Sequence, residues 1–102
     1  MMTFLVYADF RATAQVLDNA RLGKQRLECF QILNAIAKIE AGVTKGAWIN
    51  HPAVRAWIGH TDALKFYANC MIEEFTARGF KNTMSLYDLP DSIDMPWWVT
   101  WD

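Results

Sequence analysis

Apolar residues recur every three or four positions over most of residues 9–79, which is the spacing of amphipathic helices. A first helix is expected at the start of DFRATAQVLD, where Asp9 can cap the free backbone N–H groups. A second is expected over about Ala20 to Ala41, and Gly42 is a natural stop. Residues 42–47, GVTKGA, are then a loop.

A short third helix is predicted in WINHPAVRAWIGH. Pro52 suits a first helical turn, with Asn50 or His51 as the cap, and Gly59 ends the helix. A fourth helix is predicted from a Thr61 cap to about Arg78, before Gly79. It carries an apolar stripe at helical spacing: Leu64, Tyr67, Ala68, Met71 and Phe75.

The pattern changes in residues 81–102, which contain two prolines, four aspartates and three tryptophans. Proline and aspartate disfavour a long regular element here. Three indoles left exposed would keep a large apolar surface in contact with water, which is unfavourable. We therefore expect this segment to wrap irregularly over the helices. The predicted fold is an all-α, compact helical bundle that forms a single domain over residues 1–102.

Composition narrows the class of protein. Just over half of the 102 residues are apolar, enough for one modest core, and the formal net charge is −1. That balance argues against bulk electrostatic attraction to duplex DNA but leaves room for a local basic pocket. Cys29 and Cys70 are expected as buried free thiols rather than a disulfide. No signal peptide or membrane span is recognised, so a soluble cytoplasmic protein is expected.

Arg26 breaks the apolar pattern of the second helix. On a helical wheel with Arg21 at zero, the apolar residues fall between about 60 and 160 degrees, and Arg26 falls near 140 degrees. A buried guanidinium needs a partner, because burying it unpaired costs several kcal/mol. Either it pairs with Asp9, Asp18 or Asp62 or with backbone carbonyls, or the helix lines a cleft and Arg26 faces an anionic ligand.

RLGKQR gathers donors around this arginine. Arg21, Lys24 and Gln25, together with Glu28, fall on a polar face near zero degrees. Gly23 weakens the helix by roughly 1 kcal/mol compared with alanine. A glycine kept at this cost suggests that another helix or a ligand approaches the backbone closely. Such a density of donors suits a phosphate, whereas the simpler alternative is a solvated basic helix end.

NHPAVRAWIGH places Asn50, His51 and Arg55 at the start of a helix, where free N–H groups favour anions. His51 can contact a phosphate or act as an acid or base, and a simple capping histidine is equally compatible. Two histidines nine residues apart, His51 and His60, give no zinc pattern. No metal site and no cofactor are predicted.

Together, LDNARLGKQRLECFQIL, NHPAVRAWIGHTDAL and a helix ending in ARGF resemble a family of small proteins with RLGKQR and NHPAV motifs. That family is distantly similar to the phage pyrimidine-dimer DNA glycosylases of the endonuclease V type. The resemblance covers most of residues 3–82. It implies a helical domain with an aromatic-rich C-terminal segment, and a part in DNA repair.

The resemblance also implies site residues. In the related glycosylases an N-terminal threonine amine attacks C1′ of the damaged nucleotide and forms a Schiff base, which here points to Thr3. Thr3 becomes the first residue only if translation starts at Met2. Arg26 matches a phosphate-side arginine, whereas the place of the catalytic glutamate is occupied by Gly23. Glu28, about one turn later, is the candidate substitute.

Two functions remain open. One is a DNA glycosylase/AP lyase that acts on damaged DNA. The other is a non-catalytic protein, of a phage or bacterium, that sequesters a nucleotide signal. In both, Tyr7, Trp48 and Trp57 are candidates for stacking on a base, although each suits the core of so small a domain. The tryptophan-rich end could instead close a homodimer.

Overall fold

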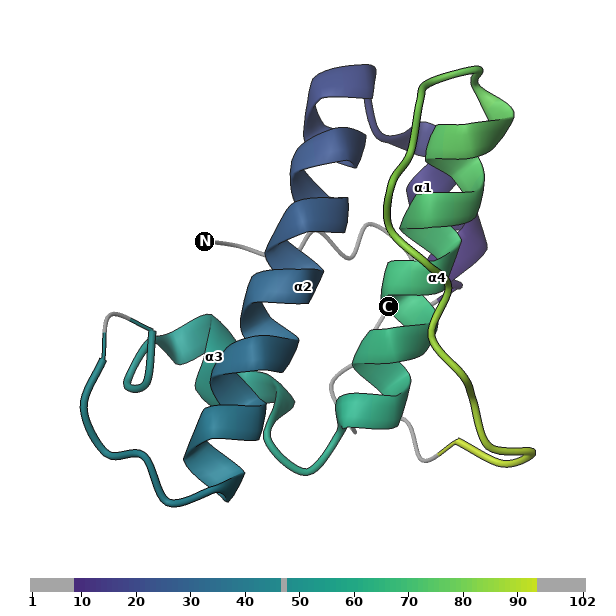
Figure 1. Cartoon of the computed structure of the whole chain (residues 1–102). Helices are drawn as coiled ribbons and strands as arrows, with labels where there is room; N and C mark the ends of the chain where they lie inside the picture. Colours follow the sequence, from purple (N-terminus) through teal and green to yellow (C-terminus); the bar gives the residue numbers. More distant parts are fainter. Residues whose placement is uncertain (1–8, 47, 94–102) are drawn as a thin grey trace.

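The computed structural model describes residues 9–46 and 48–93, which contain four helices and no strand (Figure 1). The helices are α1 (Phe10–Val16), α2 (Asn19–Glu40), α3 (Pro52–Trp57) and α4 (Thr61–Ala77). The all-α prediction is confirmed, and each expected helix is present within a few residues of its predicted bounds.

Aspartate side chains begin the first two helices. The Asp9 carboxylate accepts hydrogen bonds from the backbone N–H groups of Arg11 at 2.9 Å and Ala12 at 3.2 Å. Asp18 accepts one from the N–H of Arg21 at 2.7 Å. These bonds satisfy N–H groups that the helix itself leaves free. The Asp9 cap is therefore confirmed, and α2 starts one residue before its predicted beginning.

The two histidines precede the other two helices. His51 caps α3, because its Nδ1 accepts the N–H of Ala53 at 3.1 Å. The cap position of α4 is His60, whose carbonyl accepts the first helical bond from Leu64 at 3.1 Å. Thr61 is already the first residue of α4, so the prediction that it would cap this helix is wrong.

The main interface joins α2 and α4, which run antiparallel along each other (Figure 1). Helix α1 packs against α4, and α3 packs against α2. At the centre, the Tyr67 ring meets the Phe10 ring edge-on, with ring centres 5.2 Å apart, and lies 6.2 Å from the ring centre of Trp57. The largest fully buried side chains are Trp57, Tyr67, Phe10, Leu22, Ile32, Ile36, Leu64 and Met71.

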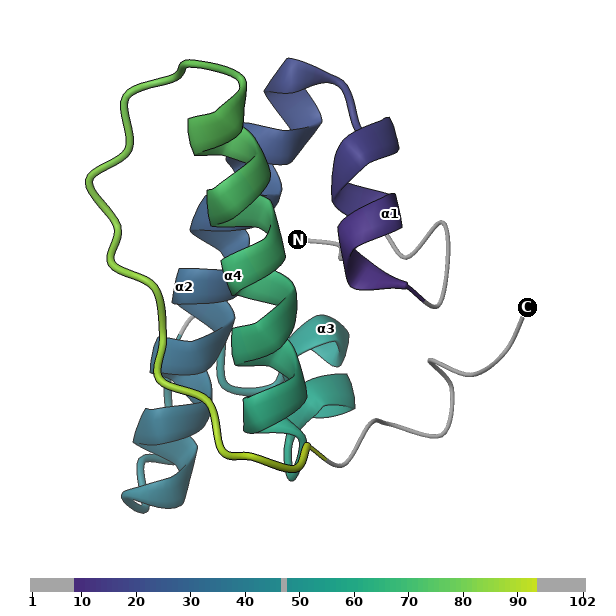
Figure 2. The ribbon, with the colours of Figure 1, turned by 90° about the vertical axis from the view of Figure 1, so that its right-hand side faces the viewer.

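Residues 80–93, the strap, have no regular secondary structure and return along α4 from its end to its beginning (Figure 2). Gly79 turns the chain into the strap with a φ of 88°, which a side chain would strain. Asn69 of α4 holds the strap through both backbone groups of Tyr87, at 2.8 Å and 2.9 Å. The irregular wrapping is confirmed for this part, whereas Trp97, Trp98 and Trp101 lie outside the described residues.

Candidate functional site

Arg26 is half-buried at the edge of the interface between α2 and α4. Its guanidinium carbon lies 4.3 Å from the centre of the Phe75 ring, and its Nη1 donates to Asn82 Oδ1 at 2.8 Å. Its Nε is buried and has no hydrogen-bond partner among the residues that the structure describes. A cation over an aromatic face and one amide oxygen thus hold Arg26 within the fold.

The carboxylates expected to pair with Arg26 do not contact it, and that prediction is wrong for Asp9, Asp18 and Asp62. The physical reason is the true direction of the core face of α2. Its buried residues centre at about 40 degrees on the wheel, the position of Gln25, so that Arg26 lies at the rim. At the rim an arginine can pack its stem on apolar atoms and needs no buried counter-ion.

Gln25 and Glu28 are buried in this face, 0% and 7% exposed, rather than placed on an open polar face. The Tyr67 hydroxyl donates to Gln25 Oε1 at 3.0 Å, and Gln25 Nε2 donates to Glu28 Oε2 at 2.9 Å. We call these three residues the polar chain. It joins α4 to α2 inside the core and fixes the orientation of the Glu28 carboxylate, since each bond orients the next group.

Gly23 owes its place to helix packing. A Cβ built at this position would lie 3.1 Å from Cε1 of Phe75, closer than side-chain carbons normally approach. The Phe75 ring in turn stacks on Phe80, with ring centres 5.0 Å apart and planes 25° from parallel. Of the two explanations for Gly23, the approach of another helix is therefore the one that the geometry supports.

The remaining cations of RLGKQR lie on the surface. Arg21 forms an exposed ion pair with Asp18, with 2.6 Å between Nη1 and Oδ2. The N–H and the charge of Arg21 hold the pKa of Asp18 below its usual range. Lys24 is exposed. The four donors Arg21, Lys24, Gln25 and Arg26 thus spread around α2 and do not converge on one open pocket.

The start of α3 is ordered by its own side chains. Asn50 Oδ1 accepts a hydrogen bond from Arg55 Nη2 at 2.7 Å. Because His51 Nδ1 accepts the cap bond, its ring proton resides on Nε2 in the neutral form. The His51 ring also lies beside the indole of Trp48, with ring centres 5.3 Å apart. Of the predicted anion ligands, Asn50 is exposed and His51 is half-buried.

The candidate stacking residues differ in how much of each side chain is exposed. Trp57 is 0% exposed and belongs to the core, so its predicted stacking on a base is wrong for the folded protein. Trp48 is 37% exposed and free to meet a ligand. Tyr7 and the candidate nucleophile Thr3 lie outside the described residues, and their roles stay predictions.

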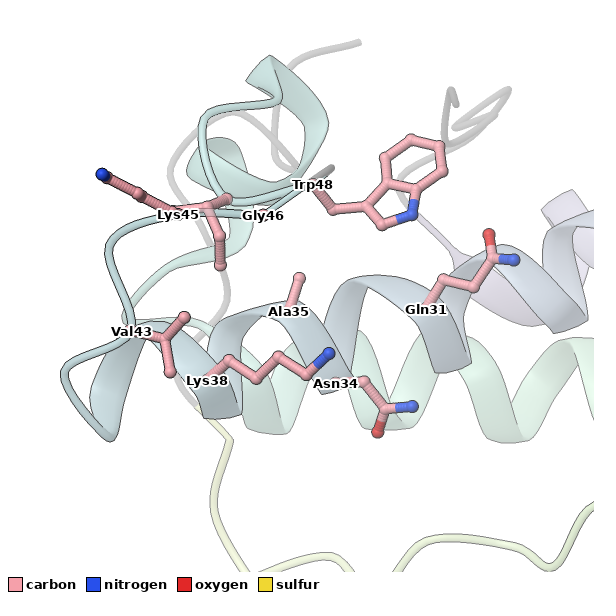
Figure 3. Close-up of a pocket in the computed structure, with 9 residues that line it drawn as sticks. Gln31, Asn34, Ala35, Lys38, Val43, Lys45, Gly46 and Trp48 are labelled. Carbon is pink, nitrogen blue, oxygen red and sulfur yellow. The ribbon is translucent and has the colours of Figure 1, made fainter.

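Trp48 stands over a hollow of about 470 Å³ beside the second half of α2 (Figure 3). Residues of α2 line one side, and the loop that follows the helix lines the other. Sequence reasoning did not find this hollow, because the loop carries no motif and only the fold brings it over α2. The lining residues are Gln31, Asn34, Ala35, Lys38, Val43, Lys45, Gly46, Trp48 and Ile49.

One stripe of α2 connects the hollow with the polar chain. Lys24, Glu28, Gln31, Ala35 and Lys38 follow one another at intervals of four, three, four and three residues. Residues so spaced lie one above another on a helix. Glu28 is therefore one helical turn from Gln31 at the near end of the hollow, while Arg26 lies on another side of α2.

Both cysteines are buried free thiols, as predicted. Burial raises the pKa of the Cys70 thiol to about 11, and it raises the pKa of Cys29 still further. Thiols so protonated at neutral pH are poor nucleophiles, and neither cysteine suits a catalytic role.

Two polar residues that motif reasoning passed over anchor the fold. Arg78, in the ARGF sequence, donates to the carbonyls of Ala14 at 3.2 Å and Gln15 at 3.1 Å, at the end of α1. It also contacts Asn19 Oδ1 at 2.9 Å and Glu74 Oε2 at 3.2 Å. Arg78 at the C-cap of α4 and Asn69 within α4 thus each position a neighbouring segment, the end of α1 and the strap.

The described residues contain no group of three histidine, cysteine, aspartate or glutamate side chains that could hold a metal ion. Their helices also include none that is long and apolar enough to cross a membrane.

The helical bundle and its polar chain do not by themselves identify a class of protein, and the sequence comparison supplies that identification. The profile of the family described as pyrimidine dimer DNA glycosylase matches residues 1–88. The chain therefore belongs to the pyrimidine dimer DNA glycosylase family, as the motif resemblance indicated. Searches of curated proteins and of solved structures gave no match.

Proposed function

We propose that this protein acts in DNA repair as a DNA glycosylase/AP lyase, with Glu28 as the carboxylate of its active site. The observation that carries the proposal is the polar chain. Glu28 is 7% exposed, and its Oε2 is held at 2.9 Å by Gln25, which Tyr67 holds at 3.0 Å. A buried carboxylate is costly to keep, and one so oriented is typical of a functional group.

The nucleophile in this proposal is the N-terminal α-amine, which is that of Thr3 when translation starts at Met2. The amine nitrogen bonds to C1′ while the bond from C1′ to the base breaks, and the base leaves with a proton. One N–H proton of the amine is thereby transferred to the base. The C1′–O4′ bond of the sugar ring then breaks, O4′ takes up the second N–H proton, and the C1′=N imine remains. A carboxylate such as Glu28 can accept an N–H proton and pass it to the leaving base or to O4′.

Borohydride trapping tests the proposal. A DNA oligonucleotide with one abasic site is mixed with the full chain, whose amine condenses with the C1′ aldehyde and releases water. Borohydride reduces the imine, and a stable protein–DNA adduct is expected on a denaturing gel. Blocking the N-terminal amine by acetylation should abolish the adduct.

The role of Glu28 is tested by Glu28→Gln, which keeps the size of the side chain. The adduct should form at least about tenfold more slowly, as expected for loss of an acid–base group. Glu40→Gln, at the exposed end of α2, is the matched control and should trap normally. Equal trapping by Glu28→Gln, with folding checked by circular dichroism, would refute the assignment.

A second candidate is a non-catalytic protein that binds a free nucleotide. The near balance of charge, with ten cationic and eleven anionic side chains, favours it, because a small ligand needs no extended basic surface. This candidate would be preferred if no adduct formed while mononucleotides raised the melting temperature. An adduct that depends on the free amine would exclude it as the whole function.

A further inference from the structure

The hollow beside Trp48 combines features that point to one kind of ligand. Trp48 offers an exposed aromatic face, while Val43 and Ile49 supply apolar surface. At about 470 Å³ the hollow has the size of a small-molecule site. Aromatic faces of this kind bind planar rings by stacking. The first requirement on the ligand is therefore a flat ring.

Two lysines give the second requirement. Lys38 of α2 and Lys45 of the loop both line the hollow, and in Figure 3 the Lys45 side chain extends outward, away from Lys38 and Trp48. Neither forms an ion pair with a carboxylate in the described part of the chain, and no acidic residue lines the hollow. Two unneutralised ammonium groups beside one cavity favour an anion. A neutral sugar or a plain hydrocarbon would leave this charge unused.

Amide side chains give the third requirement on the ligand. Gln31 and Asn34 line the same hollow from α2, and each carries both a donor and an acceptor. Such groups can pair with the edge of a nucleobase, as asparagine and glutamine do in other readers of bases. In Figure 3 the Gln31 amide lies toward the indole of Trp48. A flat ring, a polar edge and an anionic group are together the chemistry of a nucleotide.

We propose that this hollow binds one nucleoside monophosphate unit, with its base stacked on Trp48 and its phosphate attracted by the positive charge of Lys38 and Lys45. The inference rests on the proposed function in taking a nucleotide as the ligand class. The unit is either a free nucleotide or an unpaired residue of a DNA strand. In the second case the stripe on α2 leads from the hollow to Glu28, one turn away.

Calorimetric titration of the full chain tests the inference, with deoxyadenosine monophosphate as the probe. Deoxyadenosine and ribose 5-phosphate, which lack the phosphate and the base, should each bind at least about tenfold more weakly. Trp48→Ala should weaken binding of the monophosphate about tenfold or more, and Trp48→Phe should restore most of it. The phenylalanine variant shows that the lost property is stacking rather than folding.

The lysines are tested by Lys38→Gln combined with Lys45→Gln. This variant should weaken binding of the monophosphate but not of deoxyadenosine, since only the phosphate contact is removed. Lys81→Gln, an exposed lysine of the strap outside the hollow, is the matched control and should bind normally. Equal loss of both ligands would contradict the placement of the phosphate.

Two further arms distinguish the source of the nucleotide. Binding of the free monophosphate identifies a free nucleotide, whereas binding confined to a short single-stranded oligonucleotide identifies an unpaired residue of DNA. Both must depend on Trp48. If neither binds, or if Trp48→Ala binds as tightly as the wild type, the inference fails. Failure of the proposed function is read separately, as the absence of a borohydride adduct with the wild-type chain.

Discussion

Replacing Gly23 by alanine sets two opposing effects against each other. Alanine favours an interior helical position over glycine by about 1 kcal/mol. Its Cβ, however, would lie 3.1 Å from Cε1 of Phe75. That ring cannot retreat freely, because Phe80 stacks on it at 5.0 Å and Arg26 lies 4.3 Å from its centre. Overpacking of this kind costs about 1 to 3 kcal/mol.

The net expectation is that Gly23→Ala destabilises the protein by about 1 kcal/mol, a fall in melting temperature of roughly 4 to 8 °C for a domain of this size. In a Phe75→Leu background the clash is gone, and the same change should stabilise by about 1 kcal/mol. The coupling between the two positions is then about 2 kcal/mol. Urea unfolding followed by circular dichroism measures the stability of the wild type, of the two single variants and of the double variant.

Equal stabilisation of the wild-type chain and of the Phe75→Leu variant by Gly23→Ala would contradict this expectation. Gly23 would then not be required by the approach of α4, and a role at a ligand would have to be considered again.

Asn69→Ala removes both bonds to Tyr87, and limited proteolysis should then cut the strap much faster while α2 stays intact. Arg78→Ala should lower stability by about 1 to 3 kcal/mol in urea unfolding, because it removes a charged donor from one part-buried and one exposed carbonyl at the end of α1. Both thiols should react with a disulfide reagent only after unfolding. The raised pKa of Cys70 favours the folded state below the unfolded pKa near 8.5, and this stability should be lost as the pH rises toward about 11.

Controls separate these outcomes from general damage. Asn34→Ala, on the exposed side of α2, should leave cleavage of the strap unchanged. Arg21→Ala removes an exposed ion pair and should cost far less than Arg78→Ala. Rapid labelling of either thiol in the native protein would contradict the burial of the cysteines. A stability that stays flat from pH 9 to 11 would contradict the assigned shift in the pKa of Cys70.

The helices could be predicted because local signals dominate there. Asp9 caps the first helix as predicted, His51 is the one of the two candidates, Asn50 and His51, that caps the third, and Gly79 follows the last helix. Local chemistry of this kind needs no knowledge of the tertiary fold. The family could also be recognised, since RLGKQR and NHPAV are specific as a pair and the family match covers residues 1–88.

The candidate site could be predicted only in part, because binary patterning assumes that polar residues face water. Gln25 satisfies its amide inside the core through Tyr67 and Glu28, and its partner on α4 is 42 residues away. No local pattern reveals such a partner. Because Gln25 was assigned to the exposed face, the core face of α2 was predicted too close to Arg26. The hollow was missed for a similar reason, since Trp48 reaches α2 only after the loop folds back.

The polar chain also limits how the two long helices can align. Apolar side chains are interchangeable to a first approximation, so α2 and α4 could slide past each other by one turn, about 5.4 Å, and still bury similar surface. The bond from Tyr67 to Gln25 exists in one alignment only. Any other alignment would break this buried bond between the Tyr67 hydroxyl and the Gln25 side-chain oxygen, at a cost of about 1 to 3 kcal/mol, while the Gln25–Glu28 bond within α2 would persist. Tyr67 and Gln25 thereby select the register of the bundle, and a Gln25→Leu variant should gain alternative alignments even if it keeps its helices.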